Sequence, residues 1–225
     1  MDRFGDAIRT FEHAMDRARQ LIDLYDALTA IRRDNPANDD ALRSAYFQAV
    51  SSFDFFAHEV ALIEAKHRFQ NGSKTRKINL PMEVMTITDP EERLTAAATH
   101  IRQSNSFKAF VDPAKLAELL SCYCEKPWLK IVARINAGRD AADAVTEKDL
   151  KGQLKSIWKR RNQIAHEADV NPTLAGITLW PIDKTDTELT ITFITMLGEH
   201  LPHVIAESLP EADDDQDDED QGIFG

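Results

Sequence analysis

Apolar residues recur every three or four positions along two long stretches near the beginning of the chain. The first stripe consists of Phe4, Ile8, Phe11, Met15, Ala18, Ile22 and Tyr25, and the second of Leu42, Tyr46, Ala49, Phe53, Phe56, Val60 and Ile63. This spacing places the apolar side chains on one face of an α-helix, because a helix turns once every 3.6 residues. The two stretches therefore predict a pair of long helices packed together as in an antiparallel bundle.

Turn and capping residues predict where the helices begin and end. The segment DNPAND (34–39) ends the first helix and supplies caps for the second, and NGSKTRKINLP (71–81) ends the second and opens a long loop. Asp89-Pro90 and Asp112-Pro113 each place an N-cap acid before a proline at the first helical position. These two pairs predict shorter helices in the middle of the chain.

The last two helices are predicted from different signals. Thr146 and Asp149 form a capping box for a helix from about 147 to 166. The segment LTITFIT (189–195) alternates like a β-strand and is rich in β-branched residues. Helical spacing nevertheless continues through the residues that follow: Ile194, Leu197, Leu201 and Val204. We therefore predict a helix here, with a kink at Pro202.

The pattern and the composition together predict an all-α fold, an antiparallel helical bundle of four main helices and several short ones. The 225 residues are 43% hydrophobic, which is typical of a globular domain with a sizeable core. Cys122 and Cys124 are too close to form a comfortable disulfide, which fits a reducing compartment. The charged start MDRFGDAIRTFEHAM resembles neither a signal peptide nor a membrane anchor, and no apolar run could span a bilayer. We expect a soluble, cytoplasmic protein.

Charge is distributed unevenly along the chain. The formal net charge is -11, but the segment EADDDQDDEDQ (211–221) alone holds eight acids. Without these eight, 30 acids stand against 27 Lys and Arg, so the rest of the chain is nearly neutral. Six cations lie between Lys148 and Arg161 against one acid, Asp149; we call them the basic stripe (Lys148, Lys151, Lys155, Lys159, Arg160 and Arg161). We predict a folded domain over 1–209 and a disordered acidic tail over 210–225.

Three roles stay open for this tail. Its acidic run followed by QGIFG resembles the tails of single-strand-binding proteins, which dock in basic pockets on partners. It could equally fold back on the basic stripe in place of RNA, or serve only solubility.

The stretch KRRNQIAHEAD (159–169) carries the candidate chemistry. The apolar stripe of its helix runs through Leu150, Leu154 and Ile157, and the next step of four is Arg161. A guanidinium at that position is costly to bury unless it meets an anion, a carboxylate or a subunit interface. Asn162 and His166 are four apart, so the amide can orient the imidazole.

Spacing alone does not settle the function of this stretch. Arg161 and His166 are five apart, about 140° around a regular helix, so they converge only if the helix distorts or two chains contribute. A capped, solvated helix end is the alternative interpretation. The chain also contains a chance match, Arg93 and His100, in which a leucine follows the arginine.

The segment WKRRNQIAHEADVNP (158–172) resembles the Arg-polar-x-x-x-His signature of HEPN domains, in particular the RiboL-PSP-HEPN group. AYFQAVSSFDFFAHEVALIEA (45–65) resembles the aromatic second helix of that group, and WPID (180–183) the approach to its last helix. The resemblance covers most of 1–209 and does not include the tail. It implies a helical bundle that dimerises and brings two motifs to one cleft. Carried over residue by residue, the motif falls on Arg161, Asn162 and His166.

The resemblance also implies a function. Many HEPN domains are metal-independent endoribonucleases of toxin–antitoxin and phage-defence systems, and others have lost activity and only bind. We therefore expect a cytoplasmic homodimer that cleaves RNA without a metal or another cofactor, and that has an antitoxin or defence protein as a partner. The alternative is a catalytically silent HEPN module that dimerises and binds RNA, a nucleotide or a partner protein.

The residue types suit RNA cleavage without a metal. The 2′-hydroxyl of RNA attacks the adjacent phosphate, which needs a group that exchanges protons near neutral pH and a fixed cation for the charge on phosphorus. Histidine is the residue type for the first task and arginine, with its planar fork, for the second. Other cations of the basic stripe are expected to guide the RNA backbone: Lys151, Lys155, Lys159 and Arg160.

Other candidates have less support. His200 and His203, with Glu199, match metal ligands in type, but we interpret them as polar helix surface. Asp54 and His58 are four apart and either share a surface hydrogen bond or support the site from behind. Cys122 and Cys124 are interpreted as packing residues. The cations of the loop after the second helix either touch RNA or are simply solvated: Lys74, Arg76 and Lys77.

Overall fold

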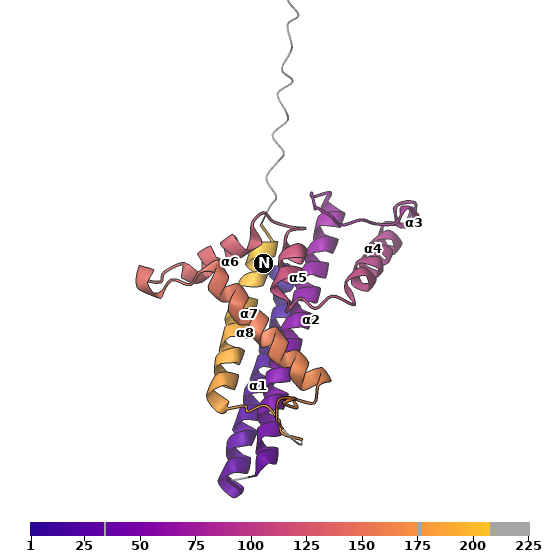
Figure 1. The fold of residues 1–225 in the computed structure, drawn as a ribbon. Coiled ribbons are helices and arrows are strands. Elements are labelled where there is room, and N and C mark those ends of the chain that lie inside the picture. Colours follow the sequence, from indigo (N-terminus) through magenta and orange to yellow (C-terminus); the bar gives the residue numbers. More distant parts are fainter. Residues whose placement is uncertain (34, 175–176, 208–225) are drawn as a thin grey trace, which may run out of the picture.

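Two long antiparallel helices, α1 and α2, form the spine of the molecule (Figure 1). The computed structural model describes residues 1–33, 35–174 and 177–207, so the predicted disordered tail lies outside the described residues. These residues form eight α-helices and no strand: α1 (Gly5–Ile31), α2 (Asp39–Asn71), α3 (Met82–Met85), α4 (Pro90–Asn105), α5 (Pro113–Leu120), α6 (Pro127–Asn136), α7 (Glu147–His166) and α8 (Lys184–Ile205). Short 3-10 turns cover Asp2–Phe4, Pro36–Asn38 and Ala141–Asp143. The all-α prediction is confirmed.

The core lies where α1, α2 and α8 pack together, and α7 crosses α2 (Figure 1). In the second predicted stripe every residue but Ile63 is buried, and in the first every residue but Ile8 and Tyr25. The described segment LTITFIT lies inside α8, so the helix prediction is confirmed, and Pro202 lies within that helix. None of the helices built by the described residues is long and apolar enough to cross a membrane.

Most of the predicted helix ends are also confirmed. Asp89 and Asp112 each accept a backbone N–H at the start of their helix, and Thr146 forms its capping box with Asp149. The turn before α2 differs from the expectation. The side chain of Asn35 caps the 3-10 turn Pro36–Asn38 rather than α2 itself, so the chain enters α2 through an extra turn.

A buried ion pair near the end of α2 joins both ends of the described chain. Glu64 Oε1 accepts from Arg68 Nε at 2.7 Å, and its other oxygen pairs with Arg3 at 2.7 Å. The remaining N–H groups of Arg68 donate to backbone carbonyls of four residues: Lys74, Tyr123, Ile205 and Glu207. A buried charge must be paired in this way, because water cannot solvate it.

A second buried ion pair fixes the end of α7. The chain leaves α7 through Ala168 and Asp169, which both have left-handed backbone angles (φ 50° and 56°). The buried carboxylate of Asp169 accepts from Arg43 Nε on α2 at 2.7 Å and from both terminal nitrogens of Arg160 on α7. Arg43 also donates to the Trp180 carbonyl at 2.9 Å. The end of the motif helix is thereby tied to α2 and to the segment before α8.

Replacing Asp169 with alanine removes the buried carboxylate that two mostly buried guanidinium groups share. We expect Asp169→Ala to lower the free energy of unfolding by about 3–5 kcal/mol, as removal of one partner of a buried pair does. Asp40→Ala is the matched control, because Asp40 also pairs with Arg43 but its side chain is 69% exposed; there we expect a change within about 1 kcal/mol. Urea unfolding followed by circular dichroism measures both. Equal effects would contradict the role assigned to Asp169.

Two helical glycines allow a second test of packing. A Cβ at Gly198 of α8 would lie 2.3 Å from Cε1 of Phe11, whose ring stacks on Phe56 at a centroid distance of 4.5 Å. We therefore expect Gly198→Ala to destabilise the fold by about 1–3 kcal/mol through overpacking. Gly152→Ala in α7 meets nothing within 4 Å, so it should stabilise by about 0.5–1 kcal/mol through helix propensity. Thermal unfolding that gives both variants the same sign would refute the packing argument.

Candidate functional site

The three motif residues lie on the last two turns of α7. Leu150, Leu154 and Ile157 are buried, and Arg161, the next residue of that stripe, is half-buried. The apolar stripe thus ends in a guanidinium, as the sequence predicted. His166 is exposed and is the last residue of the helix.

The Arg161 guanidinium is held by neutral groups. Its Nε and Nη2 both lie 3.4 Å from the hydroxyl oxygen of Ser51 on α2, and its Nη1 lies 3.2 Å from Asn162 Oδ1. The ring of Phe47, also on α2, lies beneath it at 5.2 Å from Cζ to the ring centroid. Within the described part of the chain, no carboxylate forms an ion pair with Arg161. The positive charge is therefore held in place without being neutralised.

Asn162 contacts the guanidinium and not the imidazole. No hydrogen bond between described residues joins Asn162 to His166, although the two are four apart on one helix. The amide oxygen turns instead toward its neighbour Arg161. Because α7 stays helical to its end, Arg161 and His166 project about 140° apart and do not converge within one chain.

Arg160, the neighbouring arginine, has a different environment. Its two terminal nitrogens pair with the buried carboxylate of Asp169, and Nη2 also donates to the Pro181 carbonyl at 3.1 Å. The sequence suggested that Arg160 contacts RNA, but its guanidinium is engaged in holding the end of α7. Asp169 was not identified from the sequence, because its partner Arg43 is 126 residues away along the chain.

The lysines of the predicted RNA path divide into two groups. Lys151 pairs with Glu147 and lies over the ring of Trp128 at 5.6 Å, so its charge is partly engaged. Lys155 and Lys159 are exposed on α7. These two lysines are the members of the predicted RNA path whose side chains face solvent most openly.

Asp54 and His58 on α2 do not hydrogen-bond to each other within the described chain; each holds the segment 108–111. Asp54 Oδ1 accepts from the backbone N–H groups of Phe110 and Val111, and His58 Nε2 lies 3.1 Å from the Lys108 carbonyl oxygen. Burial raises the pKa of Asp54, and the positive charges of His58 and Arg161 oppose that rise. The Asp54 carboxylate therefore lies near Arg161 but is engaged with backbone amides.

The other candidates lie away from the motif. Burial, followed by the charge of Arg134, lowers the pKa of both His200 and His203 on α8, while Glu199 is exposed. Among the described residues, no three His, Cys, Asp or Glu side chains form a group that could hold a metal. Cys124 is buried in the core and burial raises its pKa to about 11.

Arg76 of the loop after α2 and His100 of the chance match each contact another side chain. Arg76 pairs with Glu125 at 2.6 Å, whereas Lys77 is exposed with a left-handed backbone (φ 58°) and Lys74 is exposed. His100 lies 3.3 Å from the Ser104 hydroxyl of its own helix, α4, whereas Arg161 lies on α7.

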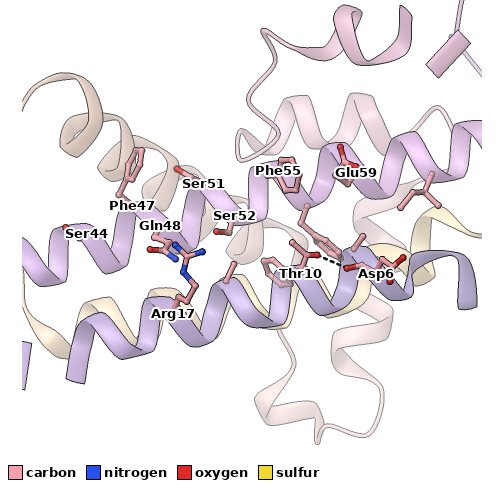
Figure 2. A pocket seen from close by; sticks show the side chains of 15 residues that line it. Asp6, Thr10, Arg17, Ser44, Phe47, Gln48, Ser51, Ser52, Phe55 and Glu59 are labelled. Atoms are coloured by element: carbon pink, nitrogen blue, oxygen red, sulfur yellow. Dashed lines mark hydrogen bonds between the residues drawn. The ribbon is translucent and has the colours of Figure 1, made fainter. Parts of the chain in front are cut away.

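An apolar groove of about 690 Å³ lies between α1 and α2, beside Arg161. Ser51 and Phe47, which contact Arg161, line this groove (Figure 2). Asp6 and Glu59 lie at one end and Arg17 at the other (Figure 2). Phe55 projects from the groove with 56% of its surface exposed. The groove was missed from the sequence, although Phe47 and Phe55 are aromatic residues off the apolar stripe of their helix, which was the available signal.

One of the comparisons with known proteins identifies a family. The family model described as RiboL-PSP-HEPN matches residues 14–207, which include α2, α7 and α8. No curated protein and no solved structure is similar enough to the chain to count as a match. The match covers most of the chain and includes the Arg-Asn-x-x-x-His motif at 161–166. The chain therefore belongs to the RiboL-PSP-HEPN family of helical HEPN domains.

Proposed function

We propose that the chain is a metal-independent endoribonuclease that acts as a toxin or anti-phage defence effector. Membership of the HEPN family points to an RNase-type or nucleotide-related function. The observation that carries the finer proposal is the contrast between two adjacent arginines. Arg160 is neutralised by buried Asp169, whereas Arg161 is fixed by Ser51, Phe47 and Asn162 and keeps its charge. A guanidinium that is held in place without a directly paired carboxylate suits a phosphate oxyanion.

The proposed reaction uses the 2′-hydroxyl of the RNA as the nucleophile. A histidine imidazole, His166, accepts the 2′-hydroxyl proton, and the 2′-oxygen forms a bond to phosphorus. The bond from phosphorus to the 5′-oxygen then breaks, and the 5′-oxygen takes up a proton from the imidazolium that the first proton transfer produced. Arg161 stabilises the charge on the phosphate oxygens throughout. The products are a 2′,3′-cyclic phosphate and a 5′-hydroxyl, so atoms and charge balance without a metal.

In this proposal, a second copy of the chain brings an arginine and a histidine of the motif together. Arg161 and His166 of one chain diverge, so a cleft between two chains would combine them. The α1–α2 groove suits a twofold interface, because it adjoins Arg161 and carries acids at one end and Arg17 at the other (Figure 2). An isologous pair places the acidic end of one copy against Arg17 of the other. It also buries Phe55, an exposed aromatic that is typical of interaction surfaces.

The alternative is a catalytically silent HEPN module that binds RNA, a nucleotide or a partner protein. The observation that favours it is the orientation of Asn162, which contacts Arg161 and leaves the exposed imidazole of His166 without that support. A cation fixed for phosphate binding needs no histidine. The two functions differ in whether RNA is cut.

The catalytic proposal is tested with purified protein, RNA and EDTA. We expect the wild type to cut RNA in EDTA and His166→Ala to lose about 10²- to 10⁴-fold in rate, as loss of a general acid or base does. Arg161→Ala should be similarly impaired, and Arg161→Lys should not restore the rate, because a point charge lacks the planar fork. Mass spectrometry of the cut ends identifies the cyclic phosphate, and a 2′-deoxyribose at the cut site should resist cleavage.

The matched controls are Arg93→Ala and His100→Ala, which change the chance pair on α4 and should keep full activity. Asn162→Ala should have a milder effect than Arg161→Ala. Cleavage that stops in EDTA, or full activity of His166→Ala, would overturn the mechanism. RNA binding without cleavage by the wild type would favour the silent module.

The interface proposal predicts the oligomeric state of the wild type and of groove variants. We expect a dimer at micromolar concentration by light scattering and a monomer for Phe55→Glu, because a carboxylate there would be buried against the partner. Leu189→Glu on α8 is the matched control, since Leu189 is 58% exposed and lies outside the groove; it should stay dimeric. Arg17→Glu should weaken the dimer, and adding Asp6→Arg should restore it. An active wild-type monomer would exclude a shared cleft.

A further inference from the structure

One face of α2 contacts the motif arginine through Phe47 and Ser51. Phe47, Ser51 and Asp54 follow one another at spacings of four and three, so they share that face. We infer that Ser51 and Phe47 are positioning residues that fix the Arg161 guanidinium for a phosphate before RNA arrives. This inference rests on the proposed function and adds to it two residues outside the motif.

The hydrogen bonds leave a defined part of the guanidinium available. Arginine has five N–H donors, one on Nε and two on each terminal nitrogen. Ser51 takes one from Nε and one from Nη2, and Asn162 takes one from Nη1. One N–H remains on each terminal nitrogen. N–H groups on the two terminal nitrogens are the donors with which an arginine can bind phosphate oxygens.

The partners hold the group without removing its charge. A serine hydroxyl and an aromatic ring are neutral, and the ring attracts the cation through its π face. A carboxylate in the place of Ser51 would form an ion pair and compete with the phosphate. An arginine side chain that is already ordered loses less conformational freedom on binding, and this pre-organisation favours the transition state.

Asp54 is an acid on the same face of α2, but its carboxylate is bound to other groups. It lies one turn after Ser51 on the same face, close enough to Arg161 for the two charges to interact. Its Oδ1 accepts from the backbone N–H groups of Phe110 and Val111, which anchor it to the segment before α5. The one acid on this face is thereby engaged, and Arg161 is held by Ser51 instead.

Steady-state cleavage of RNA tests the inference. We expect Ser51→Ala to lower kcat by about 10-fold, the usual effect of one hydrogen bond to a charged group, with a smaller change in KM. Ser51→Thr keeps the hydroxyl and should restore most of the rate. In an Arg161→Ala background, Ser51→Ala should have no further effect, because the residue acts only through that arginine. Ser104→Ala on α4, whose hydroxyl bonds to its own helix carbonyl, is the control and should match the wild type.

A second readout does not depend on activity. In a ¹⁵N NMR spectrum, the Arg161 Nε–H signal is identified by its absence from Arg161→Lys. We expect ring-current displacement of this signal, lost in Phe47→Leu and kept in Phe47→Tyr, and faster exchange with water in Ser51→Ala. Light scattering is run on both Phe47 variants, because Phe47 also lines the groove.

The outcomes separate this inference from the proposed function. If the wild type does not cut RNA but the NMR changes occur, the positioning holds and the ribonuclease proposal fails. If the wild type cuts RNA but Ser51→Ala changes neither kcat nor the Arg161 signal, the positioning is overturned and the ribonuclease proposal stands. An equal loss of rate for Ser51→Ala with and without Arg161 would also overturn it, since the serine would then act elsewhere.

Discussion

The position of the motif depends on one buried carboxylate. Asp169 accepts from Arg43 of α2 and from Arg160 of α7, and it lies in the turn that leads toward α8. Two mostly buried guanidinium groups share this partner, and removing it would destabilise the fold. The end of α7 is therefore set against α2 at one register, and that register brings Arg161 over Ser51 and Phe47.

The two adjacent arginines, Arg160 and Arg161, have different partners. Consecutive residues on a helix project about 100° apart, so Arg160 can face a buried acid while Arg161 faces α2. The first has a charged partner and gives rigidity. The second has neutral partners, and it is the one that we propose for binding a phosphate. Adjacent cations of one helix therefore have different environments, so a basic run need not be a uniform surface.

Local signals in the sequence were sufficient for the fold. The stripes from Phe4 and from Leu42, the Asp-Pro caps and the box at Thr146 depend on residues within one or two helical turns, and the structure confirms them. Periodicity also predicted that the apolar stripe of α7 ends at Arg161. The family match then confirmed the resemblance that the motif suggested.

The surroundings of the motif could not be predicted in the same way. Ser51 is 110 residues from Arg161 and Asp169 is 126 residues from Arg43, so their contacts exist only once α2 and α7 are packed. The amide of Asn162 was expected to hold His166, since spacing of four allowed it, but the nearer guanidinium is its partner. Spacing shows which side chains can meet, and only the packed structure shows which of several possible partners each one has.

The left-handed turn at Ala168 and Asp169 bears on how the protein is made. Left-handed backbone is unfavourable for residues other than glycine by about 1–2 kcal/mol each, so this turn needs the contacts around it. Those contacts come from both sides in sequence, from Arg43 and from the Trp180 backbone. When α7 has left the ribosome but residue 180 has not, the contacts from the Trp180 backbone are missing. We expect the arginine of the motif to become ordered only near the end of synthesis, so that an unfinished chain lacks the phosphate site that we propose.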